Sequence, residues 1–233
     1  MAHISHGRHR RYGGRNPLFA PFLAFTAIAG LAVAYVTFAL WPRWPGAPVS
    51  LTAPSLPIVV GGEMFNIEPA AIRQAVQRKS GNQERIDLAY LWPSLTPAEL
   101  AAKDDMTPAD PNERIFLTIA NARDEMAASE LIRTIYPRYF AQNTSAPAEG
   151  LTMRPFRDGT PYQGEDLISA DSAPDDFTAR CSRTGVGNTG MCLLERRIGH
   201  ADITVRFPRD WLTDWKKVLY GIDTVLKRLH PAA

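Results

Sequence analysis

Cys181 and Cys192, the two cysteines of the chain, are the residues whose type and spacing most directly suggest chemistry. If the residues between them form a β-hairpin whose turn centres on Val186 and Gly187, the cysteines lie directly opposite one another. Cross-strand Cβ atoms are about 4.5 to 5.5 Å apart, which permits a disulfide after modest adjustment. The sequence therefore predicts a disulfide in an oxidising compartment. One alternative is that the cysteines are buried free thiols. The other is a metal site, but two cysteines and a histidine supply too few ligands for one.

The segment 185–190 lies between the cysteines and formally matches the GxGxxG pattern of dinucleotide-binding loops. That pattern binds a pyrophosphate when a buried strand precedes the glycines and a long helix begins directly after them. Residues 190–198 instead have the composition of a strand, and the segment is expected outside the cytoplasm. A glycine-rich hairpin turn is therefore the favoured interpretation.

Side chains suited to acid–base or nucleophilic catalysis form no recognisable local pattern, since GxSxG, HExxH and Walker motifs are absent from the sequence. Three of the adjacent carboxylate pairs lie in polar, turn-like stretches: Asp104-Asp105, Glu165-Asp166 and Asp175-Asp176. Because a catalytic carboxyl must be desolvated to shift its pKa, solvated loop charges are the favoured interpretation of all three. The set closest to a catalytic group is Asp202 with His200 and Arg206. We predict no catalytic residues, no cofactor and no metal site.

These residues must be positioned by a domain that follows an apolar segment. Residues 18–41 contain no charged side chain and are flanked by Arg15 and Arg43. A helix of this length rises roughly 36 Å, enough to cross a hydrocarbon core of about 30 Å. A cleaved signal peptide is the alternative, but its apolar region is shorter and ends in small residues, whereas this segment runs into tryptophan and proline. The sequence predicts a retained, single-pass signal anchor.

The charges beside this segment predict its orientation. Residues 1–17 contain four arginines and no Asp or Glu, whereas Arg43 alone flanks the other end. The positive-inside rule therefore places the amino terminus in the cytoplasm and the rest of the chain in the periplasm, anchored to the inner membrane. The basic tail carries more than the whole net charge of +2, so the remainder is slightly acidic. We expect the lipid bilayer as a partner of the tail and helix, and no nucleic acid.

Small residues recur every four positions in the apolar segment, at Thr26, Gly30 and Ala34. Such a stripe lets two membrane helices approach closely enough for backbone packing. The alternative is chance, because an alanine-rich span produces this spacing readily. The stripe predicts a transmembrane interface with another helix.

Residues 42–57 are proline-rich, which favours an extended, semi-rigid linker. Residues 58–233 then form one domain, long enough to bury a sizeable core. Strands are predicted from alternating or β-rich composition at 58–60, 85–92, 114–120, 151–157, 163–169, 176–182, 190–198 and 202–207. The second of these strands is expected to be half-buried, and the last five to form a meander.

Helices are predicted at 68–79, 96–103, 124–135 and 210–229 from capping signals and apolar periodicity. In the last of these Asp210 is the expected N-cap, and the apolar stripe should dock on the sheet. Tyr136, Tyr139 and Phe140 follow the third helix and are interpreted as a core seam rather than a ligand site. The predicted fold is thus α+β, an antiparallel sheet with helices packed on one face.

The sequence as a whole favours a membrane-anchored periplasmic binding or assembly module that acts on a membrane or envelope protein and is not catalytic. The alternative is a membrane-tethered envelope enzyme, resembling a hydrolase, whose site assembles from residues that no local motif reveals. A buried carboxylate or histidine in a cleft would favour the enzyme, and an apolar patch or open sheet edge would favour the binding module.

Overall fold

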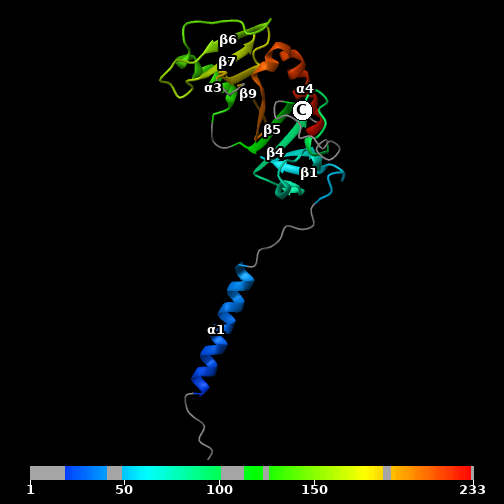
Figure 1. The fold of residues 1–233 in the computed structure, drawn as a ribbon, viewed down its shortest axis with the longest axis vertical. Helices are drawn as coiled ribbons and strands as arrows, with labels where there is room; N and C mark the ends of the chain where they lie inside the picture. The colour runs from blue at the N-terminus through cyan, green and yellow to red at the C-terminus, as the bar shows by residue number, and fades with distance from the viewer. Residues whose placement is uncertain (1–18, 41–48, 101–112, 123–125, 186–189, 232–233) are drawn as a thin grey trace, which may run out of the picture. The chain divides into compact units, whose positions relative to one another are not determined.

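The computed structural model of this chain describes residues 19–40, 49–100, 113–122, 126–185 and 190–231. The chain divides into two compact units, Met1–Gly46 and Ala47–Ala233. The first contains the helix α1, and the second contains all the strands found among the described residues (Figure 1).

The helix α1 spans Phe19–Leu40 and lies within the predicted apolar segment. Its stretch from Pro21 to Ala39 has a mean hydropathy of 2.0, and none of that stretch is buried within the structure. A helix this long and apolar can cross a membrane, as an anchor or as a signal sequence. The tail and residues 41–48 of the expected linker lie outside the described residues.

A small sheet in the order β2-β1-β3 begins the second unit. Strands β1 (Leu56–Val60) and β2 (Glu63–Ile67) form a hairpin, and β3 (Gly81–Asn82) adds a short parallel edge. The predicted strand at 58–60 is therefore part of β1. At the hairpin turn Gly61 has a φ of +60°, and a Cβ there would collide with the carbonyl of His200. Only glycine fits this close approach between the two sheets.

The α-helix predicted at 68–79 does not form. Two short 3₁₀ turns stand in its place, η1 at Pro69–Ala71 and η2 at Ala75–Gln77. Between them Ile72 forms a bridge with Leu88, and the amide of Arg73 donates to the carbonyl of Asp87 at 2.9 Å. Pairing with the neighbouring strand thus satisfies backbone groups that a helix would have used, so tertiary context overrides the local signals.

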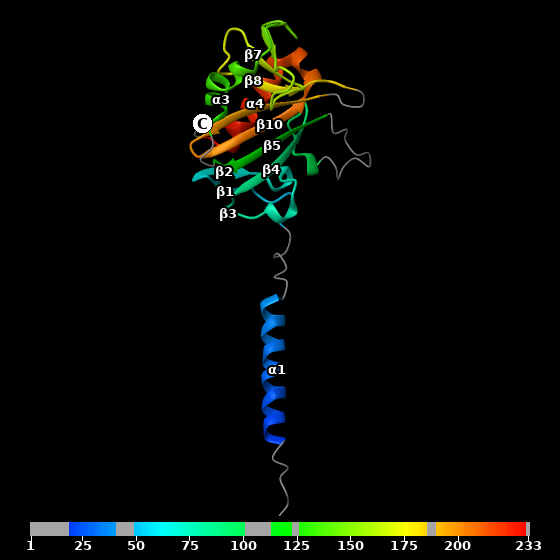
Figure 2. The same ribbon diagram turned by 90° about the vertical axis from the view of Figure 1, so that its left-hand side faces the viewer.

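The large sheet has seven strands, and every pair of neighbours is antiparallel. In spatial order they are β4 (Arg85–Leu91), β5 (Arg114–Asn121), β10 (Ala201–Pro208), β9 (Met191–Ile198), β8 (Thr178–Ser182), β7 (Glu165–Ala170) and β6 (Leu151–Pro155). Figure 2 labels β7, β8, β10, β5 and β4 in this order across the domain, with β1 to β3 beyond β4. The predicted strands and the meander from β6 to β10 are confirmed.

The strand β4 is more deeply covered than the expected half-buried strand. Residues 86–90 are all buried, although Asp87 points away from Ile86 and Leu88. The side chains alternate between two faces as predicted, but the 3₁₀ segment covers the second face, where the side chain of Gln77 forms hydrogen bonds with Asp87. Sequence alternation therefore indicated the two faces of this strand without revealing that both are covered.

One face of the large sheet packs against the carboxyl-terminal helix. That helix begins later than predicted: η5 covers Arg209–Asp214, and α4 covers Trp215–Leu229. Asp210 lies inside the 3₁₀ turn, so it is not the N-cap of the α-helix. The turn is tied to the strand ends instead, because the amide of Arg209 donates to the carbonyl of Gly190 at 3.1 Å. The buried stripe of α4 completes the main core, as predicted.

The opposite face is covered by α3 (Ala128–Thr134) and η4 (Tyr136–Tyr139), within the helix expected at 124–135 and just after it. In β7, Ile168 belongs to the main core and Leu167 to the core under α3, so the two side chains point to opposite faces. The α+β class and the antiparallel sheet are confirmed. Helical segments cover both faces, however, because the aromatic residues around η4 need a second apolar surface.

The aromatic residues around η4 form a small core, as predicted. Tyr136 lies edge-on to Phe156 at a centroid distance of 5.3 Å, and Tyr139 and Phe140 pack around the same cluster. Burial raises the pKa of Tyr136 to about 12, so its ring stays neutral at physiological pH. These side chains stabilise the second face of the sheet.

Candidate functional site

The predicted disulfide joins β8 to β9. Cys181 and Cys192 are directly opposite in the register, their Cα atoms are 4.0 Å apart, and both residues are fully buried. The predicted turn at Val186 and Gly187 lies outside the described residues. Strand β9 follows the glycine segment where a dinucleotide site requires a helix, which argues against such a site. The antiparallel register of β8 and β9 is consistent with the hairpin interpretation.

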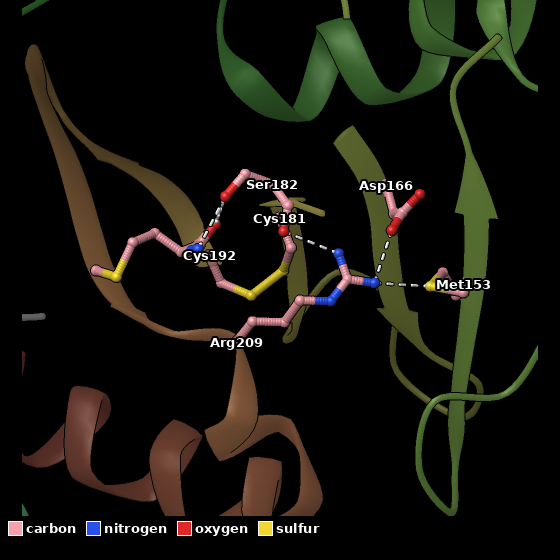
Figure 3. The surroundings of a disulfide bond; sticks show 7 residues. Met153, Asp166, Cys181, Ser182, Cys192 and Arg209 are labelled. Atoms are coloured by element: carbon pink, nitrogen blue, oxygen red, sulfur yellow. Dashed lines mark hydrogen bonds and ion pairs between the residues drawn. A yellow bond between two sulfur atoms is a disulfide. The ribbon is translucent and has the colours of Figure 1, made fainter. Parts of the chain in front are cut away.

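Arg209 lies beside this disulfide and extends from η5 toward the meander (Figure 3). Its Nη1 donates to the carbonyl of Ser182 at 3.0 Å, next to Cys181. Its Nη2 donates to Asp166 Oδ2 at 2.6 Å and lies 3.1 Å from the sulfur of Met153. One guanidinium thus connects β6, β7 and β8 to the start of the carboxyl-terminal helix.

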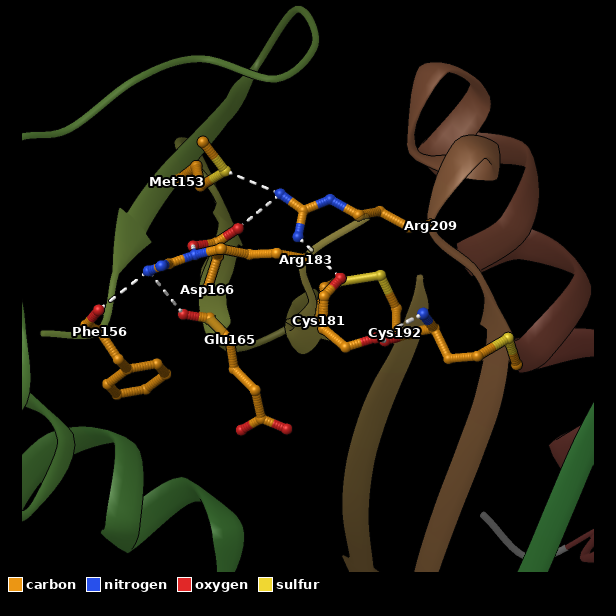
Figure 4. A network of polar contacts seen from close by, with 10 residues as sticks. Met153, Phe156, Glu165, Asp166, Cys181, Arg183, Cys192 and Arg209 are labelled. Atoms are coloured by element: carbon orange, nitrogen blue, oxygen red, sulfur yellow. Dashed lines mark hydrogen bonds and ion pairs between the residues drawn. A yellow bond between two sulfur atoms is a disulfide. The ribbon is translucent and has the colours of Figure 1, made fainter. Parts of the chain in front are cut away.

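Asp166 is the centre of this network, and its exposed fraction is 3%. While Arg209 binds one carboxylate oxygen, Nε of Arg183 donates to the other, Oδ1, at 2.9 Å (Figure 4). Nη2 of Arg183 also donates to the carbonyl of Phe156 at 2.9 Å. A buried carboxylate needs such charge-assisted bonds, since desolvation without them is costly. Both oxygens of Asp166 are therefore engaged in holding two arginines in place.

These arginines line a cleft of about 690 Å³ at the end of the meander strands. Its walls come from the segment after η4, from β6 and the loop that follows it, and from the ends of β7 and β8. The lining residues are Ala141, Asn143, Met153, Pro155, Phe156, Arg157, Asp158, Asp166, Arg183, Thr184 and Arg209. Three of them are arginines and two are aspartates, so guanidinium donors outnumber carboxylates. We call this feature the arginine cleft.

The arrangement of strands resembles that of a solved bacterial protein. The immunity protein Smlt3025 of the Stenotrophomonas maltophilia type IV secretion system matches with a TM-score of 0.54 and 14% identity, over 75% of this chain and 92% of that protein. The iron-regulated outer membrane lipoprotein FrpD of Neisseria meningitidis matches with a TM-score of 0.41 and 9% identity, over 76% and 94% of the two chains. No family model and no curated protein matches. At 14% identity, the first likeness shows the fold alone.

The interpretation of Glu165-Asp166 as solvated loop charges is wrong. Both residues lie on β7, where Asp166 is buried and Glu165 pairs with Arg180 at 2.8 Å. Alternation within β7 could have placed them on opposite faces, but nothing local indicated which arginines would meet them. Asp175 and Asp176 are exposed, as expected, and Asp104-Asp105 lies outside the described residues.

The set of Asp202, His200 and Arg206, the closest in the sequence to a catalytic group, does not assemble. Asp202 accepts two hydrogen bonds from Arg197 across the β9–β10 pair, at 2.6 and 2.9 Å. Within the described ranges no hydrogen bond joins Asp202 to His200 or Arg206. In the same ranges, no group of three His, Cys, Asp or Glu side chains is arranged to hold a metal ion.

Asp87 is the second carboxylate buried in the described part of the domain. Its Oδ1 accepts from Nη2 of Arg85 at 2.7 Å and from the hydroxyl of Thr118 at 2.9 Å, and Gln77 donates to Oδ2 at 3.3 Å. Burial by itself raises the pKa of this carboxyl, but the hydrogen bonds from Arg85, Thr118 and Gln77 together outweigh it and lower the pKa. Asp87 is thus held ionised and serves to fix β4.

We expect Asp87→Asn to destabilise the domain more at pH 7 than in acid. A folded-state pKa below the unfolded value of about 4 stabilises the protein above that pH, and the contribution disappears as the pH falls through the lowered pKa. Urea unfolding midpoints of both proteins, measured from pH 7 down to pH 2, should converge. A difference in midpoint that is independent of pH would contradict this account.

The residues of the predicted transmembrane interface lie on α1. The hydroxyl of Thr26 donates to the carbonyls of Phe22 and Leu23 within its own helix, so it needs no other partner. A Cβ at Gly30 would meet no atom within 4 Å, which leaves room beside the helix backbone. The interface formed by Thr26, Gly30 and Ala34 remains a prediction.

Proposed function

We propose that this protein is a membrane-anchored, non-catalytic module that binds a partner protein in the cell envelope. The observation that carries the proposal is the state of Asp166, whose two oxygens are both bound by arginines. A carboxylate held in this way has a charge-assisted hydrogen bond on each oxygen and serves to orient the two arginines. Beside this network, the cleft presents guanidinium donors, which bind anions, and one exposed carboxylate, Asp158, at the rim.

A related protein fold supports a specific form of this proposal. Smlt3025 is described as an immunity protein of a type IV secretion system, and its strands are arranged as in this chain. In this form of the proposal, the partner protein that this chain binds belongs to a secretion system. The runner-up, an envelope enzyme, would instead require a group in the cleft that acts on a substrate.

The binding function can be tested with the full chain in its native membrane. We expect reversible cross-linking, followed by detergent extraction and affinity purification, to isolate one protein in near-stoichiometric amount. That protein, purified separately, should then bind the purified full chain in a one-to-one complex by light scattering. Failure of every cross-linked protein to bind in this second step would overturn the proposal, as would turnover of a hydrolase substrate that Arg183→Gln abolishes.

We further propose that α1 is retained as an anchor in the inner membrane, with the amino terminus in the cytoplasm and the domain in the periplasm. The length and hydropathy of the helix and the arginines of the tail support this orientation. We expect a periplasm-dependent reporter fused after Ala233 to be active, and a cytoplasm-dependent reporter there to be silent. Carbonate-extracted membranes should retain the full-length chain. The reverse reporter pattern, or release of a shortened chain, would contradict the proposal.

The small-residue stripe of α1 is proposed to contact a second membrane helix. We expect Gly30→Leu to reduce self- or partner association in a bacterial transmembrane assay, because the added side chain separates the two backbones. Ala32→Leu, which adds a leucine side chain on the opposite side of the helix from Gly30, is the matched control. Equal signals for both variants, in this assay and in co-purification of the full chain, would reduce α1 to a simple tether.

A further inference from the structure

We propose that the arginine cleft is the docking site for an acidic side chain, aspartate or glutamate, on the partner protein. The proposal rests on the binding function described above and specifies where the partner is held. It is argued from the donors that the Asp166 network leaves unused, from their fixed orientation, and from the balance of charge at the cleft.

Arg183 has donor capacity left after its contacts within the protein. Its Nε is used by Asp166, and its Nη2 by the carbonyls of Phe156 and Glu165 at 2.9 and 3.4 Å. Its Nη1 has an ion-pair contact with Asp158 at 3.9 Å, beyond hydrogen-bond distance. The side chain is 38% exposed, so this nitrogen can be reached from the cleft.

The guanidinium of Arg183 is also held in one orientation. Three acceptors on two of its nitrogens fix the plane, and Asp166 is itself fixed by Arg209. A planar, preorganised guanidinium loses little side-chain entropy when it binds a carboxylate, and its remaining nitrogen, Nη1, can donate a charge-assisted hydrogen bond to a carboxylate oxygen. Asp166 is therefore a positioning residue for the cleft.

Arg157 supplies a second cationic group at the same cleft. Its backbone amide donates to the carbonyl of Tyr139 at 2.9 Å, and its Nη2 donates to the carbonyl of Arg138 at 2.6 Å. The residue is exposed, and its remaining nitrogens are not engaged by any described group. Asn143 and Thr184 add neutral polar groups to the lining.

The charges at the cleft favour an anion and identify one group that opposes it. Asp166 forms ion pairs with both Arg183 and Arg209, so one carboxylate is matched by two guanidinium groups and the three side chains have a net positive charge. Asp158, 93% exposed at the rim, is the remaining carboxylate and competes with an incoming one for the same guanidinium. Two adjacent exposed residues, Arg157 and Asp158, should therefore affect binding in opposite directions.

The test uses the full chain in detergent micelles and fluorescence anisotropy of a labelled peptide. The probe is a glycine-spaced peptide with four glutamates, and its control is the same peptide with four glutamines. We expect the glutamate peptide to bind at least about tenfold more tightly, with an affinity that falls as salt is raised. Arg157→Gln and Arg183→Gln should each weaken binding by about tenfold or more, since each removes a charge-assisted donor.

Asp158→Asn should strengthen binding of the glutamate peptide, and Arg206→Gln, an exposed change on β10, should leave it unchanged. The loss in Arg183→Gln could arise from disturbance of the buried network. Arg157→Gln and Asp158→Asn avoid this ambiguity because both side chains are exposed. Circular dichroism and an intact disulfide establish that each variant is folded.

Equal binding of the two peptides would overturn the proposal, as would unchanged binding in Arg157→Gln and Asp158→Asn. Displacement of the labelled peptide by inorganic phosphate as effectively as by unlabelled peptide would also overturn it, since the cleft would then be a site for small anions. If a partner is isolated by cross-linking but binds Arg157→Gln and Asp158→Asn like the native chain, the binding function survives and the docking site is elsewhere.

Discussion

Asp166→Asn is expected to destabilise the domain by roughly 3–5 kcal/mol, because removing one partner of a buried ion network leaves the others uncompensated. The substitution preserves the size of the side chain but removes the charge that Arg183 and Arg209 share at 2.9 and 2.6 Å. Arg209 is only 15% exposed, so its guanidinium cannot recover full hydration. The free energy of unfolding can be measured by urea titration of the full chain in micelles, followed by tryptophan fluorescence.

The matched control is Asp158→Asn, which removes the same charge from the same cleft. Asp158 is 93% exposed and lies 3.9 Å from Arg183, so its effect on stability should remain within about 0.5 kcal/mol. If the two variants lost similar amounts of unfolding free energy, the total charge of the cleft, rather than the buried network, would determine stability. A small loss for both would show that water or a rearranged arginine replaces the missing carboxylate.

Removing the disulfide with Cys181→Ala and Cys192→Ala together is expected to cost about 3 kcal/mol in the chain-entropy treatment. The bond closes a short loop, with a sequence separation of 11, between strands that are already paired. Because Ser182 accepts from Arg209 beside Cys181, the arginine cleft should loosen as well. The prediction is checked by the urea midpoint of the double variant and by that of the native chain after reduction.

These two measurements should agree. The urea midpoint of the double variant should also be the same with and without reductant. This control shows that the reductant acts on the native chain by breaking the disulfide. Native chains taken from freshly isolated membranes should resist alkylation until they are reduced. Two alkylated cysteines in such a sample, or an unchanged midpoint after reduction, would contradict a structural role for the bond.

Much of the fold was predictable because the responsible signals are local. The absence of charge from α1 predicts a span by itself, and the β-rich segments between turn residues located the strands of the meander. The disulfide was predictable for the same reason, since in a tight hairpin the position of the turn determines which residues face one another.

Local sequence patterns did not predict the structure where a segment distant in sequence forms hydrogen bonds or packing contacts with the same backbone or side chain. The segment 68–79 has helical spacing, yet Ile72 pairs with Leu88 and the helix is lost. Asp87 alternates correctly along β4, but only the chain folded over it determines that it is buried. In both cases the deciding contact comes from another element, whose position the sequence pattern does not specify.

The sequence by itself therefore determined the apolar helix, the strands of the meander and the Cys181–Cys192 pair, because each depends on periodicity or register over a few residues. Only the tertiary structure decided that Asp166 is buried and that Arg183 and Arg209 converge on it. These three residues come from β7, from the residue directly after β8 and from η5, and 43 positions separate Asp166 from Arg209. Their meeting depends on packing the carboxyl-terminal segment against the sheet, and a buried charge is tolerated only where such packing supplies its partners.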